Sequence, residues 1–110
     1  MIKKQDIVNI NRKFDKGNVI NSSALDFALS SVNHSKDWIT QAAYLTRAIL
    51  IDHVFEEGNK RTAAAVIYSF FESYGKAYDP YKVDKIITDM IIKNITDIAK
   101  IRRMIKNAVR

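Results

Sequence analysis

The chain contains only three glycines and one proline among 110 residues. A β-sheet protein of this length needs several tight turns, and such turns usually require one of those two residue types. Apolar residues recur instead at the three- and four-residue spacing of amphipathic helices. The sequence therefore predicts an all-α fold, and 110 residues are enough for one domain, residues 1–110, with a single hydrophobic core.

The spacing predicts about six helices. They are expected over residues 4–15, from a cap at 21–23 to about 34, from 38 to the polar segment at 53–59, from 59 to 75, from 80 to about 91, and from 97 to 109. The fourth is apolar around much of its circumference and is expected to be the central, buried helix. Thr96 is expected to cap the last helix. Phe14, Tyr74 and Ile91 fall on apolar faces and are expected in the core, and Val19-Ile20 is expected to be a short extended piece.

Cysteine is absent, which excludes disulfides, zinc sites built on thiolates and a cysteine nucleophile. The longest unbroken apolar run, residues 63–68, is far shorter than the roughly 18 residues that a membrane-spanning helix needs. No apolar segment of a secretory signal follows Lys3-Lys4. We therefore expect a cytoplasmic protein without membrane contact.

Eighteen lysines and arginines against twelve acidic residues give a net charge of +6, and much of the excess lies near the C-terminus. The basic residues of that region are Lys82, Lys85, Lys93, Lys100, Arg102, Arg103, Lys106 and Arg110. Such a charge would suit nucleic acid, nucleotides or an acidic protein segment, and charge alone does not choose among them. A basic run beside an apolar stripe is most often a solvated helix face, so nucleic acid is not the expected partner.

The segment HVFEEGNKRT, residues 53–62, is densely polar and lies between two apolar helices. Its second half is expected at the N-terminus of a helix, where unpaired N–H groups and the helix dipole favour an anion. Gly58 would let a ligand approach the backbone, and Asn59 could donate through its amide. Lys60 and Arg61 would add positive charge. These residues predict a cradle for nucleotide phosphates, but not a Walker A loop, whose spacing is absent.

Glu57 and His53 supply the remaining chemistry of this segment. Glu57 could hold a divalent cation on phosphate oxygens. His53 lies at the mouth of the cradle, and an imidazole, which titrates near neutral pH, could accept the proton of an attacking hydroxyl. The combination describes transfer of a phosphoryl or nucleotidyl group. Taken alone, however, such a histidine is more often structural, and glutamates can simply favour the start of a helix.

The segment resembles the signature of the Fic/Doc family, H-x-F-x-[DE]-G-N-x-R, and the chain is similar in size and helix order to the compact Doc-like members. The resemblance implies a compact helical bundle whose active-site loop precedes a buried central helix. It implies that His53 is the general base, that Phe55 anchors the loop in the core and that Glu57 binds Mg²⁺. The anion hole around the phosphates of ATP would be formed by Gly58, Asn59, Lys60 and Arg61.

Two positions favour the Doc subclass within this resemblance. Members that transfer AMP typically read G-N-G-R-x-x-R, whereas this chain has Lys60 in place of the second glycine and Ala64 in place of the last arginine. Doc-like toxins resemble kinases and move the terminal phosphate of ATP to a hydroxyl of elongation factor Tu. The resemblance therefore implies the toxin of a toxin–antitoxin pair. Restraint would come from a separate antitoxin, because the self-inhibiting [ST]-x-x-x-E-[GN] helix of many Fic proteins is missing.

Two alternatives remain open from the sequence. One is a Fic-type adenylyltransferase of the same fold, which would transfer AMP to a protein hydroxyl. The other is a catalytically silent interaction module or DNA-contacting module that uses its basic face. His53 argues against the silent module, and no pair of helices shows a short glycine-centred turn before a polar recognition helix. His34 lacks comparable polar neighbours and is expected in a surface loop.

Overall fold

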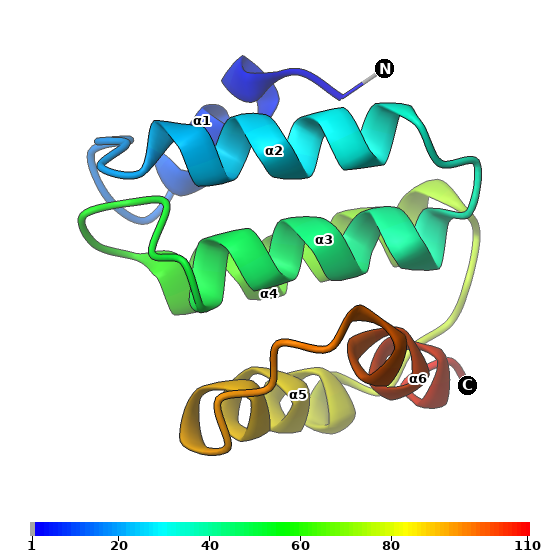
Figure 1. Cartoon of the computed structure of the whole chain (residues 1–110). Helices are drawn as coiled ribbons and strands as arrows, with labels where there is room; N and C mark the ends of the chain where they lie inside the picture. The colour runs from blue at the N-terminus through cyan, green and yellow to red at the C-terminus, as the bar shows by residue number, and fades with distance from the viewer. Residues whose placement is uncertain (1) are drawn as a thin grey trace.

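Six α-helices make up the regular secondary structure of residues 2–110, the residues that this computed structural model describes (Figure 1). They are α1 (Lys4–Asn11), α2 (Ser22–Asn33), α3 (Trp38–Leu50), α4 (Asn59–Ser73), α5 (Pro80–Ile92) and α6 (Ile98–Asn107). No strand occurs in that part of the chain, and its extended pairing consists of two isolated β-bridges. The prediction of an all-α fold with six helices is confirmed.

Side-chain caps begin three of the helices where the sequence predicts them. Asn21, Asp37 and Asp79 each accept a hydrogen bond from an N–H group two or three residues later, at 3.0–3.2 Å. These bonds satisfy N–H groups that have no partner inside the helix. The starts of α2, α3 and α5 are therefore encoded locally.

The start of α6 differs from the expectation. Asp97, rather than Thr96, is the residue before the helix, and its side chain makes no capping hydrogen bond. The carbonyl oxygen of Thr96 instead accepts a hydrogen bond from Nη1 of Arg47, at 3.2 Å. The predicted Thr96 cap is wrong. The hydrogen bond from Arg47 instead links α3 to the segment before α6.

The first helix ends four residues earlier than predicted. Asn11 is fully buried, and its Oδ1 accepts a hydrogen bond from the Gly17 N–H at 2.8 Å. This bond draws the chain back on itself after α1, as asparagine side chains often do when they compete with helical hydrogen bonding. Phe14 therefore lies in the turn and not on the apolar face of a helix, with 39% of its surface exposed.

The centre of the molecule is formed by α3 and α4 together. α3 packs against α2, α4, α5 and α6, whereas α4 packs against α1, α3 and α5. Figure 1 shows α2, α3 and α4 running alongside one another, with α5 and α6 below them. α4 therefore shares the central position with α3, and its exposed side chains include Lys60, Arg61 and Ser69.

Three other side chains near helix ends lie differently from the expectation. Tyr74 follows the last residue of α4, is 48% exposed, and stacks on Trp38 with 5.4 Å between ring centroids. Ile91, in the last turn of α5, is 39% exposed. Val109 lies beyond the end of α6, where it pairs with Tyr78 in an isolated bridge. Tyr74 and Ile91 thus continue an apolar spacing onto the exposed surface, whereas Val109 is partly buried against the core.

Two loops lie side by side at one end of α3 and α4. They are residues 12–21, in blue, and residues 51–58, in green, in Figure 1. Val19 pairs with Phe55 in an antiparallel bridge, and the Val54 carbonyl oxygen accepts from the Ile20 N–H at 2.8 Å. The predicted extended piece at Val19-Ile20 is confirmed, and it supports the loop that carries the polar motif.

The longest helix of residues 2–110, α4, has 15 residues. A helix that crosses a bilayer needs about 20 predominantly apolar residues. Within this part of the chain, no helix has both the length and the apolar character for such a crossing.

Candidate active site

Two residues in the middle of the loop 51–58 fix the loop to the core. Val54 and Phe55 are both fully buried, and the Val54 carbonyl oxygen also accepts from the Asn21 N–H at 3.2 Å. The Glu56 N–H donates to the Asn18 carbonyl oxygen at 3.0 Å. Phe55 thus occupies the place expected of the anchor, and the polar residues on either side of it are held at the surface.

Asn59 closes the loop on itself. Its Nδ2 donates to the Phe55 carbonyl oxygen at 2.8 Å, and its Oδ1 accepts from the Phe55 N–H at 3.1 Å. One of the two Nδ2 hydrogens is therefore used within the loop, and donation of the other to a phosphate stays a prediction. The backbone N–H of Asn59 remains as a donor in the first turn of α4.

Gly58 makes the sharp turn into α4. Its φ of 77° lies in the left-handed region, which side chains other than glycine rarely adopt. A Cβ atom at this position would lie 3.1 Å from Nδ2 of Asn11 and 3.3 Å from Cβ of Asp15. Both the backbone conformation and the surrounding atoms therefore require glycine here.

The N-terminus of α4 has the properties of an anion site. No side chain caps this helix, and its first hydrogen bond runs from the Thr62 N–H to the Gly58 carbonyl oxygen at 2.9 Å. The N–H groups of residues 59–61 accordingly have no partner within the helix. Together with the helix dipole and the exposed side chains of Lys60 and Arg61, they favour a bound phosphate.

His53 is exposed and held in an unusual backbone conformation. Its φ of 50° is one of two positive values for residues other than glycine within residues 2–110, the other being that of Asn94. Nδ1 of the ring lies 3.3 Å from the Ile51 carbonyl oxygen. The tautomer that carries its proton on Nδ1 can donate to this carbonyl oxygen, and Nε2 of that tautomer is the nitrogen that could accept a proton.

One cavity of about 620 Å³ brings the motif together. Six of the seven predicted site residues line it, namely His53, Glu57, Gly58, Asn59, Lys60 and Arg61. The seventh, Phe55, lies in the core behind the loop. A volume of this size is within the range of small-molecule sites. The fold therefore places the candidate base, the free helix N-terminus and the candidate metal ligand around one space.

The cavity also has walls that the motif does not include. Phe14 and Asp15 come from the turn after α1, and Ile91 and Asn94 come from the end of α5. Nothing local in the sequence marks Phe14, Asp15 or Ile91 as site residues. Asn94 carries a weak signal, because an asparagine just after a helix often adopts the left-handed conformation, as it does here with a φ of 47°.

The two neighbouring glutamates of the loop have different surroundings. Both side chains are exposed and line the cavity. The Glu56 carboxylate accepts a hydrogen bond from Nδ2 of Asn18 at 3.1 Å, whereas the Glu57 side chain makes no hydrogen bond or ion pair within residues 2–110. Residues 2–110 contain no group of three or more His, Cys, Asp or Glu side chains suited to a metal ion. Magnesium commonly needs only one or two carboxylates when substrate phosphates complete its coordination, so Glu57 fits that role.

Comparison with known proteins gives no relative for this chain. No protein-family model, no curated protein and no solved structure matches it. The interpretation of the site therefore depends on its own geometry and on the motif.

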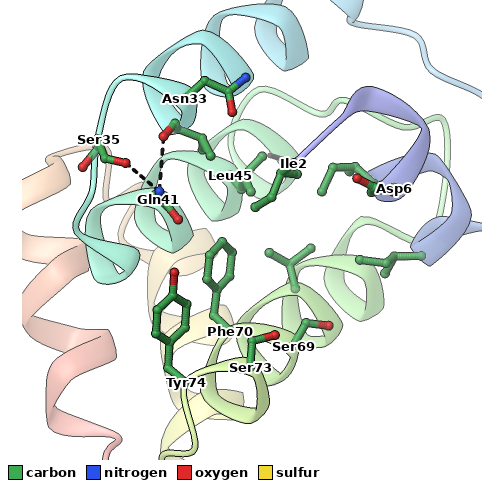
Figure 2. A pocket seen from close by; sticks show the side chains of 14 residues that line it. Ile2, Asp6, Asn33, Ser35, Gln41, Leu45, Ser69, Phe70, Ser73 and Tyr74 are labelled. Atoms are coloured by element: carbon green, nitrogen blue, oxygen red, sulfur yellow. Dashed lines mark hydrogen bonds between the residues drawn. The ribbon is translucent and has the colours of Figure 1, made fainter.

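A second cavity, of about 540 Å³, lies away from the motif (Figure 2). It shares no lining residue with the first. Its floor is apolar, with Leu45 and Phe70, and its rim carries hydroxyl and amide groups. Figure 2 shows the Gln41 amide at the rim, where Nε2 donates to the Ser35 carbonyl oxygen at 2.6 Å. No histidine or basic side chain lines this cavity, so it lacks the groups that phosphate chemistry requires.

His34 and the basic C-terminal residues lie outside both cavities. His34 ends α2 on the surface, as expected, with Nδ1 2.7 Å from the Ser30 carbonyl oxygen. Arg102 of α6 pairs with the Asp37 carboxylate at 2.7 Å. At least this member of the basic face therefore helps to join α6 to the start of α3.

Proposed function

We propose that this chain is a Doc-like toxin of a toxin–antitoxin pair, an enzyme that transfers the terminal phosphoryl group of ATP to a hydroxyl group of a translation factor such as elongation factor Tu. One observation carries the proposal: a single cavity combines a histidine with a free Nε2, an uncapped helix N-terminus and an exposed carboxylate. The motif that supplies these groups is the one that resembles the Fic/Doc signature.

The proposed reaction uses the groups around the cavity in a simple order. Nε2 of His53 accepts the proton of the target hydroxyl as its oxygen attacks the γ-phosphorus of ATP. The bond between the γ-phosphorus and the oxygen that bridges to the β-phosphate breaks, and ADP leaves. The N–H groups at the start of α4, with Lys60 and Arg61, stabilise the negative charge on the phosphoryl oxygens. The products are a phosphorylated protein, ADP and protonated His53.

Magnesium would be held by Glu57 and by phosphate oxygens of the nucleotide. When bound there, the ion would neutralise part of the charge on the phosphates. Glu56 is the less suitable ligand because its carboxylate is already bonded to Asn18.

Lys60 and Ala64 favour transfer of the terminal phosphate over transfer of AMP. Lys60 is exposed at the cavity, where members that transfer AMP have a glycine, so its bulk and charge occupy space beside the phosphates. Ala64 has no guanidinium and removes a phosphate contact that those members use. The nucleotide would then bind with its terminal phosphate towards His53.

ATP labelled separately at the α and γ phosphates tests this function. The purified chain is incubated with Mg²⁺, each labelled ATP and a cell extract, and the labelled proteins are separated. We expect label from the γ position to reach protein and label from the α position not to. Transfer of α label would instead assign AMP transfer, and transfer of neither label would favour the silent interaction module.

The antitoxin of this proposal is a separate protein. The exposed basic side chains Lys100, Arg103 and Lys106 on α6 would suit an acidic segment of such a partner. Co-expression with the neighbouring gene product should relieve growth arrest caused by the chain alone. Growth arrest that persists in the His53→Ala variant would contradict a catalytic origin of toxicity.

A further inference from the structure

One buried amide connects the segments that surround the candidate site. Asn11, the last residue of α1, has no exposed surface. Its Nδ2 donates to the Glu57 carbonyl oxygen and to Oγ1 of Thr62, both at 3.0 Å, and its Oδ1 accepts from the Gly17 N–H at 2.8 Å. A single side chain thus joins α1, the loop 12–21, the loop 51–58 and α4.

Because these three hydrogen bonds use the polar groups of the Asn11 side chain, the side chain can be buried without a large cost in free energy. Both hydrogens of the amide are donated and its oxygen accepts, so the buried polar group is satisfied. A residue that served only to end α1 would need the Gly17 bond alone. The two other bonds reach residues 46 and 51 positions later in the chain, on either side of Gly58.

The turn at Gly58 fits closely around this amide. A Cβ atom on Gly58 would lie 3.1 Å from Nδ2 of Asn11, so the missing side chain leaves room for the amide to approach the backbone. The Glu57 carbonyl that Asn11 binds belongs to the peptide that enters the left-handed turn. The direction of the Glu57 carboxylate and the start of α4 both depend on the orientation of that peptide.

We propose that Asn11 is a positioning residue of the candidate active site, whose amide holds the Glu57–Gly58 peptide so that the Glu57 carboxylate and the N–H groups of residues 59–61 face the cavity. The ligand in this proposal, ATP with Mg²⁺, rests on the proposed function. The ordering of the loop rests on the hydrogen bonds themselves. Groups that orient a metal ligand typically change metal affinity or activity by about 10-fold to 100-fold when they are removed.

The test compares Asn11→Ser with Thr62→Val. Asn11→Ser removes the amide without burying a charge, and Thr62→Val removes one acceptor of the amide but keeps the bond to Glu57. Calorimetry measures the affinity for ATP in the presence of Mg²⁺, and amide hydrogen exchange measures the order of residues 56–61. In Asn11→Ser we expect affinity to fall about 10-fold to 100-fold and exchange in the loop to accelerate. Thr62→Val should change neither.

Equal losses in the two variants, or none in Asn11→Ser, would overturn the proposal. If Asn11→Ser does not fold, the wild-type chain supplies the test through its Asn11 side-chain NH₂ resonances. In the wild-type chain, the Asn11 side-chain NH₂ resonances should shift when Mg²⁺ and ATP are added. Unmoved Asn11 resonances beside shifted N–H resonances of residues 58–61 would also overturn it. Absence of ATP binding by the wild type would contradict the proposed function, and hydrogen exchange would still decide the role of Asn11.

Discussion

At the scale of single residues, His53 combines exposure, strain and a defined hydrogen bond. A left-handed backbone at a residue other than glycine or asparagine costs of the order of 1–3 kcal/mol and persists only where the surroundings fix it. Here the buried pair Val54 and Phe55 fixes the chain immediately after it. Such conformations gather at functional sites, which agrees with the proposed role of His53 as a base.

The first prediction concerns this base. His53→Ala should reduce γ-phosphoryl transfer by about 100-fold to 10,000-fold, because a general base contributes a factor of that size. His34→Ala is the matched control, since that ring also contacts a backbone carbonyl but lies outside both cavities. Initial rates with γ-labelled ATP and circular dichroism measure activity and fold. Unchanged activity in His53→Ala would remove this residue from the mechanism.

The second prediction separates the two neighbouring glutamates. Glu57→Ala should raise the Mg²⁺ concentration needed for ATP binding and leave thermal stability unchanged, because its exposed side chain makes no hydrogen bond in residues 2–110. Glu56→Ala should leave the Mg²⁺ requirement as it is, because its carboxylate bonds to Asn18. Calorimetric titrations over a range of Mg²⁺ concentrations measure the difference. An equal defect in both variants would show that Glu57 is wrongly assigned as the Mg²⁺ ligand.

The third prediction compares two glycines with similar backbones. Gly58 and Gly75 have φ values of 77° and 62°, so alanine at either position should cost about 1–2 kcal/mol of unfolding free energy. Gly58→Ala should cost more, because its Cβ would meet Asn11 and Asp15, whereas a Cβ on Gly75 has no atom within 4 Å. Urea unfolding of both variants measures the difference. Equal costs would contradict the close packing of the loop on Asn11.

At the scale of the elements, Asp37 links the start of α3 to α6. The pKa of its carboxyl lies below the ordinary value, chiefly because the Thr40 hydroxyl donates to it. Partial burial opposes this effect, and Arg102 and the Ile39 N–H lower the pKa further. Since the folded-state pKa is the lower one, the carboxylate stabilises the fold above the unfolded-state pKa. That stability is lost as pH falls through the folded-state pKa.

The fourth prediction follows from this link. At pH 7, Asp37→Asn should lower the unfolding free energy by about 0.5 kcal/mol, the usual size for an exposed ion pair, because asparagine caps a helix about as well as aspartate does. The gap between the unfolding free energies of variant and wild type should narrow as pH falls below the unfolded-state pKa and through the lower folded-state pKa of Asp37. Asp26→Asn is the control, because Asp26 forms only an exposed ion pair with Lys4. A gap that stays constant from pH 7 to pH 3 would contradict the role of the charge.

The elements also show what could be predicted from the sequence. The starts of α2, α3 and α5 were predictable because Asn21, Asp37 and Asp79 cap the helix that directly follows them. The end of α1 was not predictable, because it depends on the bond from the Gly17 N–H to Asn11, where the chain turns back on itself. The start of α6 was not predictable either, because Thr96 bonds to Arg47, which lies far away in the sequence.

The same distinction applies to the candidate site. Its motif residues are contiguous, so the sequence identified them, and the fold brings six of them to one cavity. Asn11, Asp15 and Asn94 come from other parts of the chain and carry no comparable pattern. The engagement of the Asn59 amide with Phe55 was also missed, because it depends on how the loop closes.

At the scale of the whole molecule, the two cavities described above differ in their chemistry. One is built where α4 begins, and its titratable lining residues are His53, Lys60 and Arg61 together with Asp15, Glu56 and Glu57. The other is lined by the second half of α4 with residues of α1, α2 and α3, and it is apolar with a hydroxyl and amide rim (Figure 2). Of these two cavities, only the first has the free N–H groups and the basic side chains that would bind a nucleoside triphosphate.

A crystal structure of the wild-type chain with Mg²⁺ and a non-hydrolysable ATP analogue tests the central claim most directly. We expect the triphosphate to lie against the N–H groups of residues 59–61, Mg²⁺ to contact the Glu57 carboxylate, and the terminal phosphate to be the one nearest to Nε2 of His53. An α-phosphate nearest to His53 would contradict the kinase reaction. A nucleotide in the cavity of Figure 2, or no phosphate at the start of α4, would contradict the site itself.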